Sequence, residues 1–265
     1  MPYRIDISEV PGDFIVERLI ELGALDVDVS DSRRLAALMP DAIRAEDVAS
    51  TLGIEHISVS DAVGRDADSI WLLHPRSISI GRLRVIPSHM DEEPRAVKLI
   101  DGPAFGTGLH PTTMLCLEAL DEITETGVPA AALDVGTGSG VLALAALTLG
   151  VPRALGIDVD DESLRVAAEN ARINRLDTRL ELRRGGPEAV TGAWPLVFAN
   201  ILAASLIELA PALVRRVGHE GCLVLSGISS SAATEVVTVY HDLGLRPAGT
   251  RSRSGWIAAV LLAPW

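Results

Sequence analysis

The residues best suited to bind a ligand lie in a glycine-rich stretch near the middle of the chain. Asp134 ends an apolar, strand-like run, and three glycines follow at alternate positions, Gly136, Gly138 and Gly140. Glycines allow the backbone to approach a ligand more closely than a Cβ atom would permit. The apolar segment after Gly140 is expected to be helical, so the N–H groups at its start would face the same place. The spacing therefore predicts a strand, a tight bend and a buried helix that together bind a small molecule.

A second acidic residue follows at the spacing expected of a nucleoside site. Asp158 ends another strand-like run, 22 residues after Gly136. In a doubly wound sheet this position lies beside the first bend, where a carboxylate can bind a ribose diol. Val141 stands three positions after Gly138, where the nicotinamide-dinucleotide fingerprint requires Gly or Ala. Asp134 adds an anion that a pyrophosphate site would avoid. A nucleoside with a cationic portion therefore fits better than a dinucleotide.

Further polar residues are expected near the same edge of the sheet. Asn200 follows the strand-like run 194–199, and ligands of open α/β sheets bind at the carboxyl ends of the strands. Its amide could orient a reacting group, although asparagine also serves as a turn or helix-cap residue. Thr113 falls in the first turn of a helix expected over residues 111–126, where its hydroxyl could meet a ligand or cap the helix. His110 could be a general base, or it could cap that helix or order the loop before it.

These stretches resemble a known class of enzymes. The sequence D-V-G-T-G-S-G at residues 134–140, together with Asp158, resembles the motifs of the seven-stranded S-adenosylmethionine-dependent methyltransferases. Two other stretches narrow the resemblance to the family that methylates protein L11 of the large ribosomal subunit. They are A-F-G-T-G-L-H-P-T-T at residues 104–113 and A-N-I-L-A at residues 199–203. The resemblance is good over residues 70–230 and weak over the first 65.

The resemblance implies S-adenosylmethionine as the cofactor and a set of residues that bind it. Asp134 is expected near the ammonium group of the cofactor, the glycines against its methionine portion, and Asp158 on its ribose. Asn200 is expected to orient the attacking nitrogen. The implied cofactor-binding residues are Phe105, Gly106, Thr107, Thr113, Asp134, Gly136, Gly138, Gly140, Asp158 and Asn200. One departure is Leu109, which replaces the second threonine of the family's usual F-G-T-G-T-H loop, so a contact from that hydroxyl is missing.

The implied activity is N-methylation of lysine or N-terminal amino groups of ribosomal protein L11, by direct transfer and without a metal ion. Two alternatives remain open. The chain could be a methyltransferase of the same fold that acts on another protein or on a small molecule. It could also be a non-catalytic module that binds S-adenosylmethionine.

Composition and charge limit the kinds of macromolecule that the chain is expected to bind. The chain has 265 residues, of which 48% are hydrophobic, and a formal net charge of −13. Nucleic acids favour basic surfaces, so we expect no direct nucleic-acid binding. Residues 1–70 hold 15 acidic residues and six arginines. This acidity is either a docking face for a basic ribosomal protein or an ordinary solvated surface.

Other features indicate a soluble enzyme without a metal site. The longest apolar run is shorter than the roughly 20 residues that a bilayer span requires, and no leader opens the chain. Cys116 and Cys222 both lie in apolar patterns, and neither they nor the histidines have metal-ligand spacing. We expect a cytoplasmic monomer with no metal site.

The alternation of strand-like and helix-like segments predicts an α/β protein with a Rossmann-like seven-stranded methyltransferase sheet. The expected domains are a small α/β substrate-recognition domain over residues 1–65, a connector over 66–95 and the methyltransferase domain over 96–265. The small domain is expected to resemble a shortened ferredoxin-like fold. A hairpin of antiparallel strands is expected to close the sheet.

Several local expectations follow from residue patterns. Residues 33–39 are expected to form a loop or a short helix, and residues 54–59 a strand. Residues 71–73 are expected to form a strand before the one at 83–87. Pro211 is expected to break or restart its helix. Gly218 and Gly221 are expected to mark a turn.

Overall fold

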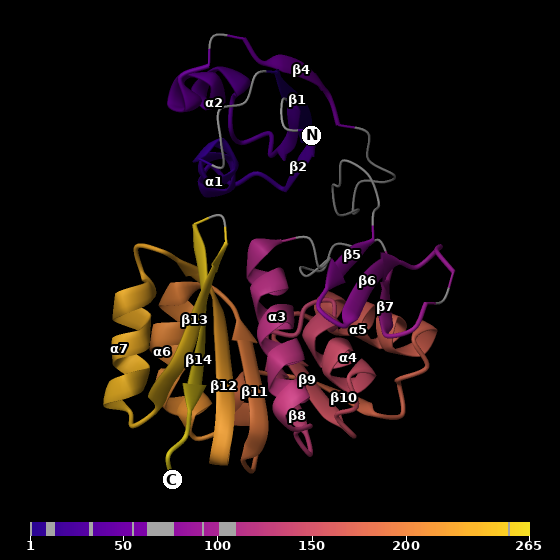
Figure 1. The fold of residues 1–265 in the computed structure, drawn as a ribbon, viewed down its shortest axis with the longest axis vertical. Helices are drawn as coiled ribbons and strands as arrows, with labels where there is room; N and C mark the ends of the chain where they lie inside the picture. The colour runs from indigo at the N-terminus through magenta and orange to yellow at the C-terminus, as the bar shows by residue number, and fades with distance from the viewer. Residues whose placement is uncertain are drawn as a thin grey trace. The chain divides into compact units, whose positions relative to one another are not determined.

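A computed structural model of the chain describes residues 2–8, 14–31, 34–54, 56–62, 77–91, 93–100, 110–253 and 255–265 (Figure 1). The chain divides into two compact units, Met1–Pro75 and Arg76–Trp265. None of the helices in the described part of the chain has both the length and the apolar composition that a membrane span requires.

The first unit is a four-stranded antiparallel sheet with two helices. Its elements are β1 (Tyr3–Ser8), α1 (Phe14–Glu21), β2 (Asp26–Asp31), β3 (Arg34–Met39), α2 (Ala45–Leu52) and β4 (Ser58–Asp61). The strand order is β2-β3-β1-β4, which is a ferredoxin-like arrangement; we expected a shortened form of it. The core lies between sheet and helices and includes Ile5, Leu19 and Val48, which are buried completely.

Two expectations for this unit are wrong. Residues 34–39 form β3, an inner strand between β2 and β1, rather than a loop or short helix. Leu35 through Met39 are all buried, so the strand lacks the polar alternation by which a half-exposed strand is recognised. β4 begins at Ser58 rather than Ile54, because the N–H of Ile54 still bonds to the carbonyl of Ala49 and completes the end of α2.

The second unit is built on a seven-stranded sheet. Its strands are β8 (Ala132–Val135), β9 (Ala154–Asp158), β10 (Leu180–Arg184), β11 (Trp194–Asn200), β12 (Val217–Ser229), β13 (Arg246–Arg253) and β14 (Trp256–Leu262). The order is β10-β9-β8-β11-β12-β14-β13. The first five strands in this order are parallel, and β14 runs antiparallel to both of its neighbours. This confirms the expected α/β class and the closing hairpin.

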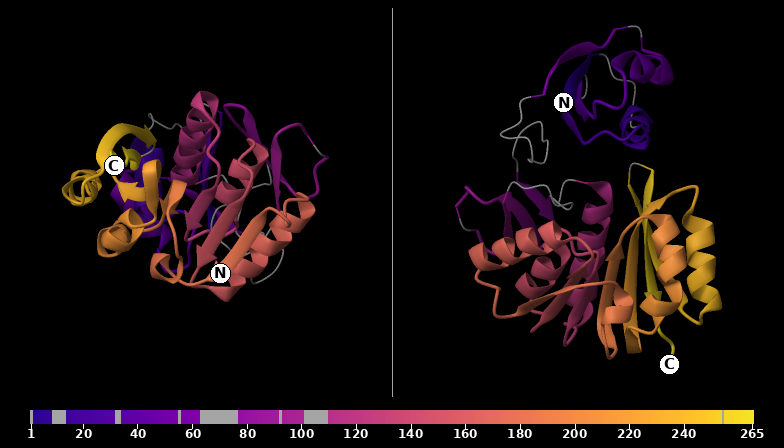
Figure 2. Two further views of the ribbon diagram at one scale, coloured as in Figure 1. Left: turned by 90° about the horizontal axis from the view of Figure 1, so that it is seen from below. Right: turned by 180° about the vertical axis from the view of Figure 1, so that it is seen from behind.

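Helices cover both faces of the large sheet (Figures 1 and 2). On one face lie α3 (Pro111–Thr126), α4 (Val141–Thr148) and α5 (Asp161–Ile173), and on the other lie α6 (Ala203–Val214) and α7 (Ala233–Asp242). Alternate strand residues supply the two cores: Leu196 and Phe198 of β11 face the α3–α5 side, whereas Val197 and Ala199 face the α6–α7 side. A short 3-10 helix, Pro187–Ala189, precedes β11.

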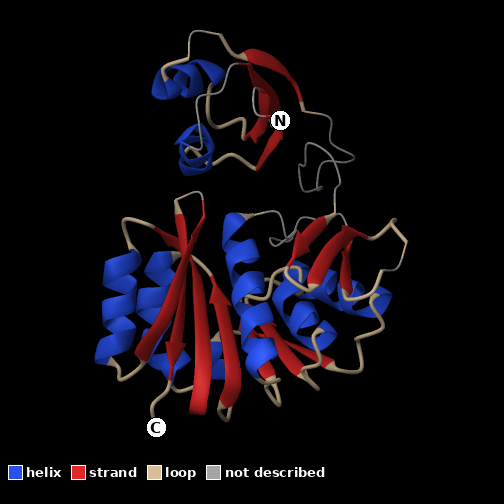
Figure 3. Ribbon diagram, in the orientation of Figure 1, coloured by secondary structure: helices blue, strands red, loops and turns tan. Residues whose placement is uncertain are grey.

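A three-stranded sheet packs on the α3–α5 side (Figure 3). It consists of β5 (Ile78–Ile80), β6 (Leu83–Pro87) and β7 (Ala96–Leu99), with β6 antiparallel to β5 and parallel to β7. Arg82, in the β5–β6 turn, donates to Oδ1 of Asp121 at 2.8 Å and so ties the hairpin to α3. The strand expected at residues 71–73 lies outside the described residues.

Two further expectations for the second unit are wrong. α6 continues through Pro211, which lies on the exposed side, where water can satisfy the carbonyl that the missing N–H would have bonded. Leu206, Ala210 and Leu213 on the opposite side are buried completely and hold the helix on the sheet. β12 begins at Val217, so the glycines at 218 and 221 lie within the strand.

Candidate functional site

The bend between β8 and α4, called here the glycine bend (residues 136–140), has the geometry that the sequence predicts. All three glycines have positive φ: 71° at Gly136, 54° at Gly138 and 81° at Gly140. A Cβ atom at Gly136 would lie 2.5 Å from Cγ2 of Ile201. The bend therefore requires glycine for both its conformation and its close packing.

Three backbone N–H groups of the bend are hydrogen-bonded to β9. The N–H groups of Gly136 and Thr137 bond to the carbonyl of Ile157, at 2.9 and 3.0 Å. The N–H of Gly138 donates to Oδ2 of Asp158 at 2.9 Å. These three groups hold the bend against β9, so its contribution to a ligand is mainly the absence of side chains.

Asp134 lies beneath the bend and supports it. Its Oδ2 accepts the hydroxyl of Thr137 at 2.7 Å and the N–H of Ala143, in the first turn of α4, at 3.3 Å. Burial raises the pKa of Asp134 to about 6, although both of these bonds favour the carboxylate. Its Oδ1 is buried without a hydrogen-bond partner among the described residues. Asp134 is not part of the cavity wall.

Asp158 lies at the carboxyl end of β9 and on the wall of the cavity. Besides the bond from Gly138, its Oδ1 accepts the N–H of Asp160 at 3.1 Å. Two backbone groups therefore fix the carboxylate next to the bend. This is the position expected for a carboxylate that binds a ribose diol.

Asn200 lies at the carboxyl end of β11 and faces α3. Its Nδ2 donates to Oγ1 of Thr113 at 3.4 Å, while its Oδ1 is buried without a partner among the described residues. A buried amide oxygen without a partner is costly unless a ligand supplies a donor. Asn200 lines the cavity, whereas Thr113 is completely buried behind it, and its neighbour Thr112 forms part of the wall.

His110 is the N-cap of α3, as one of the two sequence interpretations predicted. Its Nδ1 lies 2.8 Å from Oγ1 of Thr112, and Pro111 follows at the first helical position. The imidazole packs edge-on against Trp256, the first residue of β14, with 5.3 Å between ring centroids. Burial lowers the pKa of His110 to about 4, so the ring is neutral at pH 7.

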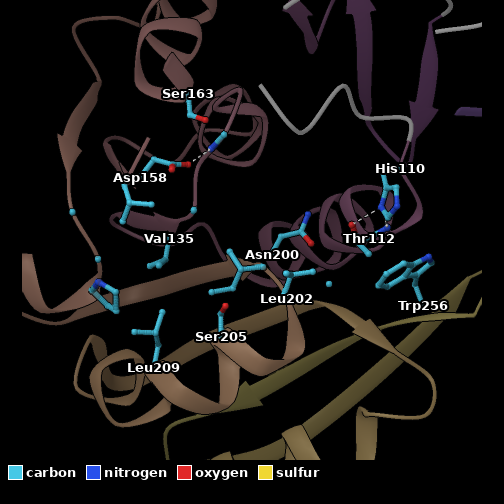
Figure 4. Close-up of a pocket in the computed structure, with 18 residues that line it drawn as sticks. His110, Thr112, Val135, Asp158, Ser163, Asn200, Leu202, Ser205, Leu209 and Trp256 are labelled. Carbon is cyan, nitrogen blue, oxygen red and sulfur yellow. Dashed lines mark hydrogen bonds between the residues drawn. The ribbon is translucent and has the colours of Figure 1, made fainter. Parts of the chain in front are cut away.

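These residues surround one cavity of about 570 Å³ (Figure 4). At one side, the bend end, lies Asp158 with Gly138 of the glycine bend bonded to it; at the other, the aromatic end, lie His110 and Trp256, with Asn200 and Leu202 between the two ends. Asp158 supplies a negative charge and His110 is neutral, so the lining favours a ligand with a positive portion. Among the described residues, no group of three His, Cys, Asp or Glu side chains could hold a metal ion.

The structure brings together most of the residues that the sequence predicted, and adds others. Gly136, Gly138, Asp158 and Asn200 line the cavity; Thr113, Asp134 and Gly140 lie directly behind its wall. Phe105, Gly106 and Thr107 lie outside the described residues. Lining residues that sequence reasoning missed include Val159, Ser163, Leu202, Ser205, Leu209 and Trp256. Gly185 and Gly186 also lie on the cavity wall.

Comparisons with known proteins identify the family of the chain. The family model described as "Ribosomal protein L11 methyltransferase (PrmA)" matches residues 45–263. A ribosomal protein L11 methyltransferase of Sorangium cellulosum is 34% identical, with 98% of this chain and 95% of that protein aligned. The one from Azotobacter vinelandii is also 34% identical, over 96% of each chain. The crystal structure of the ribosomal protein L11 methylase from Lactobacillus delbrueckii subsp. bulgaricus superposes with a TM-score of 0.64 at 30% identity, covering 70% of this chain and 97% of that one.

Proposed function

The chain belongs to the ribosomal protein L11 methyltransferase family, and we propose that it methylates amino groups of ribosomal protein L11, on lysine side chains, at the N-terminus, or both. Members of this family are S-adenosylmethionine-dependent enzymes. When bound, that cofactor supplies a methyl group on a positively charged sulfur, which an amine nitrogen can attack directly. The chain's own residues then have to position the two reactants and exclude water.

The observation that carries the proposal is the cavity that connects the glycine bend to Asn200. Gly136 and Gly138 line the cavity without side chains, which suits the methionine portion of the cofactor. Asp158 is placed to bind the ribose, and Asp134 supplies a negative charge beneath the bend. Thr113 fixes the amide of Asn200 so that its buried Oδ1 is available to an N–H donor.

The aromatic end suits an amine that must lose its proton before it reacts. A lysine amine in water has a pKa of about 10.4. Trp256 and the neutral ring of His110 provide little solvation for a cation, so they lower the pKa of an amine that enters beside them. The Oδ1 of Asn200 can accept one N–H and so point the nitrogen lone pair towards the methyl group.

For the first unit we propose a role in binding the protein substrate, with residues 1–65 as the recognition domain. Its acidity supports this role, because ribosomal proteins that contact RNA are basic. Glu46 and Asp61 are exposed acidic residues of this unit. Changing both to lysine should raise the KM for the protein substrate about fivefold at low salt and leave kcat unchanged. The control variant changes the exposed Glu235 and Asp242 of the second unit to lysine; an equal rise in KM there would contradict the assignment.

The test of the function is methyl transfer from labelled S-adenosylmethionine to purified ribosomal protein L11, together with calorimetric titration of the cofactor. We expect label on L11 amino groups and cofactor binding in the micromolar range. Asp158→Ala should abolish cofactor binding without unfolding the chain. The control Asp161→Asn removes an exposed carboxylate at the same edge of the sheet and should leave affinity unchanged.

The outcomes separate the alternatives. Cofactor binding with label on a different protein or on a small molecule would overturn the choice of substrate but not the enzyme class. Cofactor binding without transfer to any acceptor would indicate a non-catalytic module. Unchanged affinity in Asp158→Ala would overturn the role of Asp158.

A further inference from the structure

Two asparagines at the end of α5 form hydrogen bonds with β7 (Ala96–Leu99) and with Ile100, the residue that continues it. Oδ1 of Asn170 accepts the N–H of Ile100 at 2.8 Å. Asn174, the C-cap of α5, accepts the N–H of Lys98 at 2.8 Å and donates its Nδ2 to the carbonyl of Lys98 at 2.7 Å. The helix therefore satisfies backbone groups of the strand with side-chain amides.

The spacing of the two elements explains why two asparagines can do this. Residues four apart on a helix are about 6 Å apart along its axis, and residues two apart on a strand are about 6.6 Å apart. On β7 the carbonyl of Leu99 bonds to Ser88 on the β6 side, so Lys98 and Ile100 present their N–H groups to the opposite side. Asn170 is therefore level with Ile100, and Asn174 with Lys98. The two side-chain amides bond to the backbone groups that a neighbouring strand would otherwise satisfy.

Asn170 makes one additional bond, and it leads to the glycine bend. Its Nδ2 donates to the carbonyl of Ser139 at 2.9 Å, and the side chain is completely buried. Both functional groups of this amide are therefore used, one on β7 and one on the bend. No water can replace either bond easily, because the site is inaccessible to solvent.

We propose that Asn170 is a positioning residue for the cofactor: it fixes the carbonyl of Ser139, and with it the path of the glycine bend, relative to β7. The inference rests on the proposed function, since it assigns the cofactor to this bend. Asn174 provides an internal comparison, because it binds the same strand without touching the bend. The two side chains should therefore have similar effects on folding and different effects on binding.

The experiment compares Asn170→Ala with Asn174→Ala by calorimetric titration of S-adenosylhomocysteine, thermal unfolding and backbone hydrogen exchange. Both variants should have a lower Tm. Asn170→Ala should weaken binding roughly tenfold and speed exchange of amides in residues 138–142, whereas Asn174→Ala should change the Kd less than about twofold and leave that exchange unchanged. If Asn170→Ala does not fold, Asn170→Ser is measured in its place.

Equal changes in Kd for the two variants, or an unchanged Kd in the position-170 variant, would overturn the inference. The wild-type titration separates this result from a failure of the proposed function. If the wild type does not bind S-adenosylhomocysteine, the proposed function fails. In that case, the comparison of hydrogen exchange in residues 138–142 between the two variants and the wild type still decides whether Asn170 fixes the glycine bend.

Discussion

At the bend end of the cavity the surface that meets a ligand is mostly backbone, whereas at the aromatic end it consists of side chains from two distant parts of the chain. The bend end depends on residues 134–158, which are close together in the sequence. The aromatic end depends on His110 and Trp256, which only the fold brings together. A substitution that adds a side chain to a backbone surface is almost never tolerated, whereas a surface made of side chains can change one residue at a time. We therefore expect the two ends to respond differently to mutation.

The largest effect is expected at the bend itself. Gly136→Ala places a methyl group 2.5 Å from Cγ2 of Ile201 and puts alanine at a φ of 71°. We expect cofactor affinity to fall more than about 100-fold and stability to fall by about 1–3 kcal/mol. Calorimetric titration and urea unfolding measure the two quantities.

The control for this variant is Gly192→Ala. Gly192 has a φ of 82° but open space around it, so alanine there has the same backbone strain without the clash. It should destabilise the chain and leave affinity unchanged. A similar loss of affinity in both variants would contradict the idea that close backbone approach defines this end.

A smaller effect, confined to turnover, is expected where the two ends meet. Asn200→Ala removes the buried Oδ1 that we assign to the acceptor amine, so kcat should fall roughly 10- to 100-fold while the Kd of the cofactor changes less than threefold. Thr113→Val keeps the amide but removes the oxygen that orients it, and kcat should fall less than in Asn200→Ala. Steady-state kinetics and titration provide both values. If Asn200→Ala weakens cofactor binding by a larger factor than it lowers kcat, Asn200 belongs to the bend end instead.

The smallest effect is expected from protonation at the aromatic end. The pKa of His110 is about 4 in the folded chain and 6.5 in the unfolded one, so the unfolded state binds a proton first as the pH falls. The neutral His110 ring makes its full contribution to the free energy of unfolding above pH 6.5, and about 2 kcal/mol of that free energy is lost between pH 6.5 and pH 4.5. His110→Asn retains an N-cap residue and should remove this part of the pH dependence. Urea unfolding of both proteins across this range measures it, and identical pH profiles would show that the imidazole is not held neutral.

The same contrast explains what the sequence could predict. The bend, Asp134 and Asp158 follow from glycine spacing and strand ends, which are local signals, and most helices of the second unit follow from periodicity. β3 was missed because a strand buried on both faces lacks alternation. Trp256 carries no local signal, because only the strand order places it beside His110. Asn170 was missed for the same reason: its two partners, Ile100 and Ser139, lie 70 and 31 residues away.

The reversed direction of β14 has a consequence for how such an enzyme can diversify. Because β14 runs against its neighbours, its first residue, Trp256, lies at the edge where the parallel strands end. Residues inserted into the connection between β13 and β14 would therefore be added beside the acceptor, while the pairing of β14 with β12 keeps the register of the sheet. Evolution or design could exchange one acceptor for another by lengthening a single hairpin, with the glycine bend and Asp158 left as they are.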